Sequence, residues 1–438
     1  MHLHLANDYC AIDFGTSNSA LVLPENAVAG QMRLAKLDKL EEGAQSVQSP
    51  SQFFSTLPTA VFYHAEDSTR AYGRSAIAAY IDGYDGRLMR SMKSILGTDL
   101  MEQTTEIGLG LTVKYADVVG GFLRHLKTMA EQQHTAKLEK VVLGRPVFFV
   151  DGDPGRDAKA QNALASAAHA IGFKEVAFQY EPIAAALDYE SRISAEKIVL
   201  VADIGGGTSD FSIVKVSPAR HTKLDRADDI LGNFGVHIAG TDFDRAVNLA
   251  SIMPLLGLGS LGPDGKRVPG SVYFDLATWH LINTVYGANR VIELKQMASM
   301  YADKIKLQRL IHTINQRLGH HLAAKAESAK IAVSINGTAQ IDLDVVEEAL
   351  CVDLPASEVF ASLADHVHKI VAAAKETVHQ AGLKPSQIDA LYFTGGSTGL
   401  SFLSERIGEA FSQAERVFGD RFASVAMGLG IYAQRRFA

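Results

Sequence analysis

The sequence predicts an α/β protein built from two related lobes that face each other across a cleft. Strand patterns and helix patterns are mixed along the whole chain, which favours this fold class. The 438 residues are enough for two or more lobes with cores of their own. One glycine-rich pattern also occurs twice, once in each half of the chain, so the two lobes are expected to be related.

The predicted strands and helices follow from local patterns. Short apolar segments rich in β-branched or aromatic residues predict strands at residues 20–23, 141–143, 198–202, 211–216 and 390–393. Helices are expected over residues 161–171 and 359–380, each closed by a nearby glycine, and from Pro182 onward. The stretch "GLGSLGPDGKRVPG" at residues 257–270 predicts a flexible connection, and the surrounding residues 251–317 are expected to be an elaboration of the second lobe.

Composition excludes several functional classes. The net charge is −7 and no block of Lys or Arg stands out, so nucleic acid is not an expected partner. No apolar run approaches the roughly 18 residues that span a bilayer, and the N-terminus lacks the pattern of a signal peptide. Two cysteines cannot build a disulfide framework. We therefore expect a reduced, cytoplasmic protein without a membrane partner.

The repeated pattern predicts two phosphate-binding β-hairpins. "AIDFGTSNSALVL" begins at Ala11 and "VADIGGGTSDFSIV" begins at Val201, and each has a strand, an aspartate, a glycine-containing hydroxyl-rich turn and a second strand. In common phosphate loops the glycines open onto a helix, whereas here strand follows the turn. Glycine lets the backbone approach phosphate closely, and Thr16, Ser17 and Thr208 add hydroxyl donors. Either stretch alone is equally well a plain hairpin; together they favour a phosphate chain held between the two turns.

The aspartates of the two hairpins suggest a magnesium site. Asp13 and Asp203 occupy the same place in the two copies, at the end of the first strand. Mg²⁺ usually keeps several waters and bridges phosphate oxygens, so carboxylates at these positions would hold the ion through its waters.

The motifs resemble those of the seventy-kilodalton heat-shock chaperone family of the DnaK type, within the actin-like ATPase superfamily. The segments "IDFGTSNS", "EPIAAALDY", "ADIGGGTSDFS" and "LYFTGGST" stand in the family's order, and the chain is most similar to its short YegD-type members. The resemblance implies an actin-like fold of two lobes, each with a smaller subdomain, around a central ATP site. Lobe I would comprise residues 1–194, with 418–438 returning to it, and lobe II residues 195–417.

The resemblance implies a role for each matching residue. Phosphate would be bound by two sets of hairpin residues: Asp13, Gly15, Thr16, Ser17 and Asn18 in the first, and Asp203, Gly205, Gly206, Gly207 and Thr208 in the second. Lys93 and Glu181 would serve the attacking water, with Asp203 and Thr208 completing the catalytic set. By spacing alone, Lys93 would be a surface lysine and Glu181 an acidic residue at a helix start.

The nucleoside side of the site departs from the family's pattern. The resemblance places Gly240, Glu327, Lys330, Ser334, Gly395, Gly396 and Ser397 around ATP or ADP. Two arginines that stack on adenine in the family are replaced by Ile331 and Gly399, which predicts looser binding of the base. Without the ordered motifs, Glu327, Lys330 and Ser334 would equally be a solvated helix face.

Three functional classes remain open. The first is a slow Mg²⁺-dependent ATPase, related to chaperones, whose lobe closure is recognised by a partner protein. The second is a small-molecule kinase with Asp210 as the nearest candidate base, and the third is a nucleotide-gated binding module without turnover. No peptide-binding domain is expected, because the sequence ends shortly after the last ATPase motif. Residues 251–317, which carry Trp279, are either a partner surface or a packing insertion.

Overall fold

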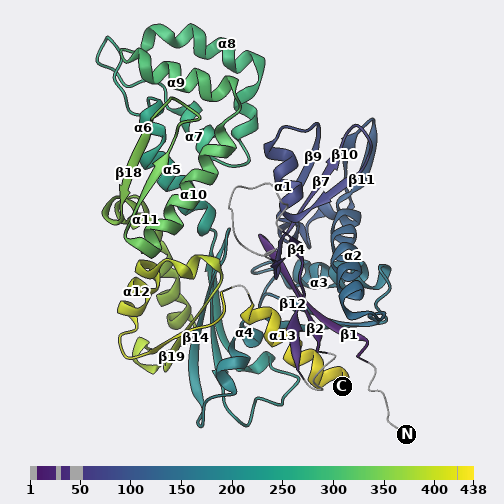
Figure 1. The fold of residues 1–438 in the computed structure, drawn as a ribbon. Helices are drawn as coiled ribbons and strands as arrows, with labels where there is room; N and C mark the ends of the chain where they lie inside the picture. The colour runs from purple at the N-terminus through teal and green to yellow at the C-terminus, as the bar shows by residue number, and fades with distance from the viewer. Residues whose placement is uncertain (1–6, 26–30, 40–52, 422) are drawn as a thin grey trace. The chain divides into compact units, whose positions relative to one another are not determined.

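The structure is a computed structural model that describes residues 7–25, 31–39, 53–421 and 423–438 (Figure 1). The chain forms two compact units. Unit 1 comprises Met1–Gly235, Ala373–Thr398 and Gly408–Ala438, and unit 2 comprises Val236–Ala372 and Gly399–Ile407. Unit 1 contains both large sheets, so the predicted lobe boundaries at residues 194 and 417 do not coincide with these units and stay a prediction.

The first large sheet of unit 1 contains the first glycine hairpin. Its strand order is β13 (Glu175–Tyr180), β12 (Lys140–Arg145), β1 (Tyr9–Phe14), β2 (Asn18–Pro24) and β3 (Met32–Leu34), and β6 (Thr56–Pro58) also pairs with β2. β1 runs antiparallel to β2 and parallel to β12. The predicted strands at residues 20–23 and 141–143 are confirmed as parts of β2 and β12.

The second large sheet repeats this arrangement around the second hairpin. Its order is β16 (Ile230–Val236), β15 (Ser209–Val216), β14 (Lys197–Ile204), β19 (Ala390–Thr394) and β20 (Glu415–Phe418). β14 is antiparallel to β15 and parallel to β19, as β1 is to β2 and β12. The repeat seen in the sequence therefore extends to the strand pairing, and the three predicted strands in this half are confirmed.

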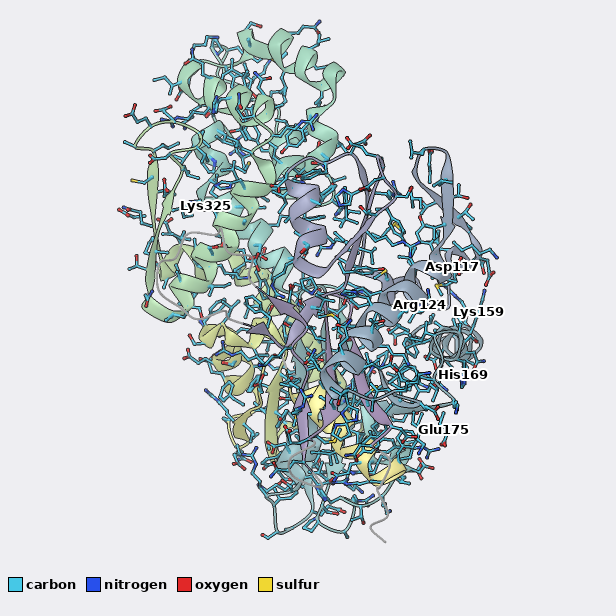
Figure 2. All side chains as sticks on the ribbon, turned by 45° about the vertical axis from the view of Figure 1, so that its right-hand side comes forward. Asp117, Arg124, Lys159, His169, Glu175 and Lys325 are labelled. Atoms are coloured by element: carbon cyan, nitrogen blue, oxygen red, sulfur yellow. The ribbon has the colours of Figure 1, made fainter. Side chains whose placement is uncertain are left out.

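Two helices cover one face of the first sheet. α2 (Tyr115–His134) and α3 (Pro154–Ala170) bury Phe122 and Leu164 in one core with Phe14 of β1. α3 begins seven residues before the predicted start at residue 161, because Pro154 opens it and the Asp153 side chain accepts a hydrogen bond from the Arg156 amide. The exposed side chains of Arg124 and Lys159 point outward from these helices (Figure 2).

A second core joins the two sheets of unit 1 through α4 (Glu181–Glu190) and α13 (Ser424–Phe437). It includes Ile183 and Leu187 of α4, Leu429 of α13, and side chains of β1, β12, β14 and β15. The two helices touch at their backbones, since a Cβ atom on Gly428 would lie 1.9 Å from the carbonyl oxygen of Ala184. The predicted helix around Pro182 is confirmed and begins at Glu181.

Smaller elements complete unit 1. A three-stranded sheet has the order β8 (Arg70–Tyr72), β7 (Ala60–His64) and β9 (Gly86–Arg90), with α1 (Gly73–Ile81) packed against it. Two further two-stranded sheets pair β10 (Thr104–Gly108) with β11 (Leu111–Lys114) and β4 (Asp38–Lys39) with β5 (Phe53–Phe54). A 3₁₀ turn over Met92–Ile95 follows β9.

Unit 2 is mostly helical. It contains α5 (Gly240–Ser251), α6 (Met253–Leu256), α7 (Ser271–Ala277), α8 (Ala288–Gln296), α9 (Lys304–Asn315), α10 (Gly319–Asn336), most of α12 (Ser401–Ala410) and the hairpin β17 (Thr338–Asp342)–β18 (Cys351–Pro355). α11 (Ala356–Gln380), predicted over 359–380, begins in unit 2 and ends in unit 1. None of the described helices is both long and apolar enough to span a bilayer.

The elaborated segment at residues 251–317 forms helices with buried side chains. The hydroxyl of Tyr273 donates to the carbonyl oxygen of Leu256 and lies 3.2 Å from the hydroxyl of Tyr301. The expected flexible connection at residues 257–270 has hydrogen bonds of its own, from the Gly262 amide to Lys266 and from the Val268 amide to Ser260. Trp279 packs edge-on against His320, with ring centroids 4.9 Å apart.

We predict that Gly428→Ala destabilises the protein, because a methyl group cannot fit between α13 and the Ala184 carbonyl without moving a helix. The free energy of unfolding should fall by about 1–3 kcal/mol, as in other overpacked cores. Chemical denaturation monitored by circular dichroism measures the change.

Gly120→Ala is the matched control in α2. A Cβ atom at Gly120 meets nothing within 4 Å. The substitution should therefore raise the free energy of unfolding by about 0.5–1 kcal/mol through helix propensity alone. Equal effects of the two substitutions would contradict close packing of α13 on α4.

Candidate functional site

The two predicted hairpin turns are present in unit 1. The first joins β1 to β2 through residues 15–17, and the second joins β14 to β15 through residues 205–208. A Cβ atom at Gly15 would lie 2.1 Å from the carbonyl oxygen of Asn18, so the first turn requires glycine there. The Gly205 amide closes the second turn by donating to the carbonyl oxygen of Thr208 at 3.0 Å.

The two turns and the third glycine stretch lie next to one another. A Cβ atom at Gly206 would be 2.6 Å from the Ser17 hydroxyl, so the two turns nearly touch. Gly395 has φ +87°, and a Cβ atom there would lie 2.5 Å from the Ile204 carbonyl oxygen. Gly396 begins the 3₁₀ turn over Gly396–Gly399, in which the Ser397 hydroxyl donates to the Gly205 carbonyl oxygen at 2.7 Å.

Thr59 supports the first turn and was not predicted from the sequence. Its amide donates to the carbonyl oxygen of Ser17 at 2.9 Å, and its hydroxyl donates to that of Gly15 at 2.8 Å. The hydroxyl groups of Ser19 and Thr59 are also hydrogen-bonded to each other, with their oxygens 2.9 Å apart. A threonine after a short edge strand carries no sequence signal for this role, because the partners lie forty or more residues earlier.

Lys93 and Glu181 form an ion pair next to the hairpins. The Nζ atom of Lys93 lies 2.6 Å from Oε1 of Glu181, and the two side chains are only 11% and 15% exposed. Burial lowers the pKa of Lys93, but Glu181 and Asp13 raise it by more, so the net shift is upward. The alternative of a surface lysine is therefore wrong for Lys93, and Glu181 at the first turn of α4 is its partner.

Two carboxyl groups of the hairpins, those of Asp13 and Asp203, have raised pKa values. Burial raises the pKa of Asp13 to about 7, with repulsion from Glu181 adding to the shift and Lys93 opposing it. Burial also raises the pKa of Asp203 to about 8, with further repulsion from Asp210 and Glu181. Three carboxyl groups, those of Asp13, Glu181 and Asp203, thus interact with Lys93, and Asp210 adds a fourth negative charge beside Asp203. The cluster has an excess of negative charge when all of them are ionised.

This donor set fits Mg²⁺ held through water. The groups are hard carboxylate oxygens, and a divalent cation would offset their mutual repulsion. Within the described part of the chain, no three His, Cys, Asp or Glu side chains are grouped to ligate a metal directly.

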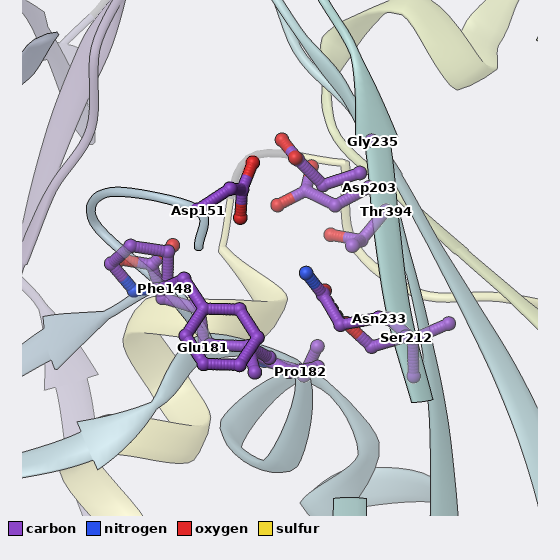
Figure 3. Close-up of a pocket in the computed structure, with 14 residues that line it drawn as sticks. Phe148, Asp151, Glu181, Pro182, Asp203, Ser212, Asn233, Gly235 and Thr394 are labelled. Carbon is purple, nitrogen blue, oxygen red and sulfur yellow. Dashed lines mark hydrogen bonds between the residues drawn. The ribbon is translucent and has the colours of Figure 1, made fainter. Parts of the chain in front are cut away.

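A cavity of about 80 Å³ adjoins Glu181 and Asp203. Figure 3 shows Asp203, Thr394 and Asn233 along one wall, with Phe148 and Asp151 facing them across the cavity. Further lining residues are Pro146, Val147, Pro182, Ala185, Val201, Asp210, Ser212 and Gly235. The sequence offered no signal for most of these positions, because Asp151 follows an irregular loop and Asn233 lies on a strand that was not predicted.

Four of the predicted nucleoside-binding residues lie in unit 2. Gly240 begins α5, while Glu327, Lys330 and Ser334 lie on α10. Nζ of Lys330 lies 2.6 Å from Oδ1 of Asp244, whose pKa burial raises to about 6. The remaining residues differ in environment: Glu327 is exposed, the Ser334 hydroxyl donates to the Gly399 carbonyl oxygen at 2.8 Å, and Ile331 is half exposed.

The fold and these hairpins define the class of the protein. Two β-hairpins, each in a sheet with a parallel neighbour strand, agree with the actin-like ATPase fold. The sequence matches the family model described as Hsp70 protein over residues 89–250 and 295–434, which is more than half of the chain. The chain belongs to the Hsp70 family, a family of ATP-binding, chaperone-related proteins. The matched ranges contain Lys93, Glu181 and the second hairpin, but not the first.

We predict that Asp203→Asn stabilises the protein when nucleotide and metal are absent. The folded-state pKa of about 8 lies above the ordinary value of about 4, so the folded protein binds this proton more tightly than the unfolded chain. The contribution of Asp203 to stability therefore falls as pH rises from about 4 to about 8. At pH 8 the variant should gain about 1–2 kcal/mol over the parent, and near pH 4 the gain should vanish.

Denaturant titrations in EDTA at several pH values measure this difference. Asp151→Asn is the control, because it also removes a carboxylate from the cavity wall but at an exposed position. If the difference in the free energy of unfolding between Asp203→Asn and the parent does not change with pH, the pKa of Asp203 is not raised by burial.

Proposed function

We propose that the protein binds ATP with Mg²⁺ and hydrolyses it slowly, in the manner of a chaperone-related ATPase. The observation that carries this proposal is the convergence of three glycine stretches beside the buried Lys93–Glu181 pair. Backbone amides of Gly205–Thr208, with Thr16 and Ser17, would hold the phosphates, and Gly395 and Gly396 would lie under the nucleotide. Asp13 and Asp203 would hold Mg²⁺ through water.

The chemistry requires mainly positioning and neutralisation of charge. Phosphoryl transfer to water spreads negative charge over the transferred group, and bound Mg²⁺ supplies part of the compensation. Lys93 supplies a buried positive charge, and the Glu181 carboxylate would orient the attacking water. The Thr208 hydroxyl donates to Asp210 at 2.7 Å, which holds the side chain at the end of the second turn.

The cavity beside Glu181 supports water as the acceptor. Its polar lining suits ordered water beside the Glu181 carboxylate, because buried water needs several hydrogen-bonding partners. The small-molecule kinase is the second candidate: Asp210 lines the cavity, as an acceptor base would, but it also accepts the Thr208 hydrogen bond.

The nucleoside would be held by α10. We infer that Glu327 and Ser334 contact the ribose or base, and that Lys330 does so only if its ion pair with Asp244 rearranges. Ile331 offers an apolar surface where an arginine would stack, so the base should be bound more loosely than in relatives with that arginine.

The wider role remains part of the proposal. A short, YegD-like chaperone relative would act in the cytoplasm and convey its nucleotide state to a partner or client protein. Residues 251–317 are one candidate partner surface, although the packing of Trp279 on His320 also suits a structural insertion. A nucleotide-gated module without turnover would bind ATP equally well and show no phosphate release.

We predict a thermal shift with Mg²⁺ and ATP. Ligand that binds only the folded state adds about 2.7 kcal/mol at a hundredfold excess over Kd. Differential scanning fluorimetry with ATP, ADP and GTP, each with and without Mg²⁺, measures the shift and the preference for adenine. A melting temperature unchanged by every nucleotide at millimolar concentration would contradict the assignment of the glycine turns.

We also predict that Lys93→Met and Glu181→Gln slow turnover more than they weaken binding. Both side chains serve the transition state, so the rate of phosphate release should fall about 100-fold or more, while Kd for ATP changes less than about tenfold. The double variant should be no slower than the worse single one, since the pair acts as a unit.

Lys159→Met is the matched control for this measurement. Lys159 also forms an ion pair, 3.0 Å from Asp99, but both side chains are largely exposed on the surface. Its substitution should leave phosphate release unchanged. Parental rates in the Lys93 and Glu181 variants, with intact ATP binding, would show that these two residues are not catalytic.

A further inference from the structure

A second and larger cavity lies elsewhere in unit 1. Its volume is about 470 Å³, within the range of small-molecule sites. It is lined by the segment before β4, by β6, β8 and α1, and by α2. None of its lining residues belongs to the glycine turns or to the carboxylate cluster.

The walls of this cavity combine an apolar floor with cationic side chains. Leu37 and Leu57 are buried at the floor, and Met129 of α2 contributes a thioether. Lys36 and Arg70 are exposed cations on the same lining. An apolar floor below two positive charges matches a ligand that has an apolar body and an anionic head.

The one acidic side chain of the lining, Asp38, does not outweigh these two cations. Asp38 lies 2.9 Å from Nη1 of Arg74, so its negative charge already has a partner. His125 is stacked on Tyr72 with ring centroids 4.0 Å apart and planes 5° from parallel. Burial lowers the pKa of His125. The two cations Lys36 and Arg70 outnumber the single carboxylate Asp38 on the lining.

The cavity is held open by hydrogen bonds around it. The Gln133 side chain accepts from the Lys36 amide at 2.8 Å and donates to the Lys36 carbonyl oxygen at 2.7 Å, which fixes this segment to α2. Arg74 also donates to the Thr56 carbonyl oxygen at 2.9 Å, which ties α1 to β6. Preformed walls lower the ordering cost of binding.

The floor of this cavity is connected to the first glycine turn. Leu57 pairs with Ser19 in the β2–β6 ladder, and two residues later Thr59 makes the hydrogen bonds that hold Gly15 and Ser17. A ligand that contacts Leu57 would therefore restrict the strand that supports the turn. Restricting one site before the other is filled lowers the entropy cost of the second binding event, which gives positive coupling.

We propose that this cavity binds a small carboxylate with an apolar body, and that its occupancy tightens nucleotide binding through β6 and Thr59. Arg70 and Lys36 receive the carboxylate, and the floor formed by Leu37, Leu57 and Met129 receives the apolar body. The first part stands without nucleotide; the second rests on the proposed function.

Isothermal titration calorimetry of the full chain with octanoate, phenylpropanoate and octylamine tests the site. At least one of the two carboxylates should bind saturably, and octylamine should not. If octanoate binds more tightly than phenylpropanoate, the site prefers an aliphatic body; the reverse order indicates an aromatic one. Arg70→Gln should weaken binding about tenfold, as expected for a lost charge-assisted hydrogen bond. Arg87→Gln is the matched control, because Arg87 and Arg70 both pair with Tyr63 in the same sheet but only Arg70 lines the cavity.

A filling substitution gives an independent test. Ser75 is an exposed residue of α1 on the lining, so Ser75→Phe should abolish carboxylate binding without loss of folding. Ala78→Phe, at an exposed position of the same helix outside the lining, should bind like the parent. Absence of saturable binding, or equal binding by the parent, Arg70→Gln and Ser75→Phe, would overturn the site.

The coupling is measured by the affinity for ATP with and without the carboxylate that binds. Kd for ATP should fall at least about threefold, and linkage requires the same factor in the carboxylate affinity when ATP is present. The Thr59→Val variant should bind the carboxylate with the parental affinity. In this variant, the carboxylate should no longer tighten the binding of ATP. An unchanged Kd for ATP would overturn the coupling alone, and a protein that binds the carboxylate but no nucleotide would refute the proposed function and not the site.

Discussion

The burial of α4 between the two large sheets of unit 1 is the constraint on which the site depends. The helix contributes to one core with strands of both sheets, and α13 covers it at the Gly428–Ala184 contact. Glu181 stands at the first turn of this helix, so its carboxylate is carried by a largely buried element of the unit. If Glu181 has the proposed catalytic role, its precise placement needs such a support, because small displacements cost large factors in rate.

The same enclosure explains the electrostatics of the site. A carboxylate in water keeps its ordinary pKa, whereas Asp13 and Asp203 are held where burial and neighbouring carboxyl groups resist ionisation. Lys93 relieves only part of this repulsion. Repulsion of this kind destabilises the protein alone and would be released when a cation binds with a phosphate chain. At these residues, the proposed ligand binding would therefore be opposed to the stability of the protein alone.

The sequence predicted the repeated parts of this structure well and the supporting parts poorly. Both hairpins were predictable because the pattern of strand, aspartate, glycine and hydroxyl group recurs, and the strand pairing repeats with it. Lys93 was predictable only through family resemblance, because burial of a lysine depends on a partner 88 residues away. Thr59 and Asn233 were not predictable, since their roles arise from contacts across strands rather than from local patterns.

The two cavities of unit 1 differ in the kind of ligand that their chemistry admits. The cavity beside Glu181 is small and lined by several acidic and hydrogen-bonding side chains, which suits water. The one above Leu57 is several times larger, with an apolar floor and two cations, which suits an organic anion. β6 lies at the second cavity and, through Thr59, at the first glycine turn. Only Pro58 separates Leu57 from Thr59, so β6 gives the proposed coupling between the larger cavity and the first glycine turn a short covalent route.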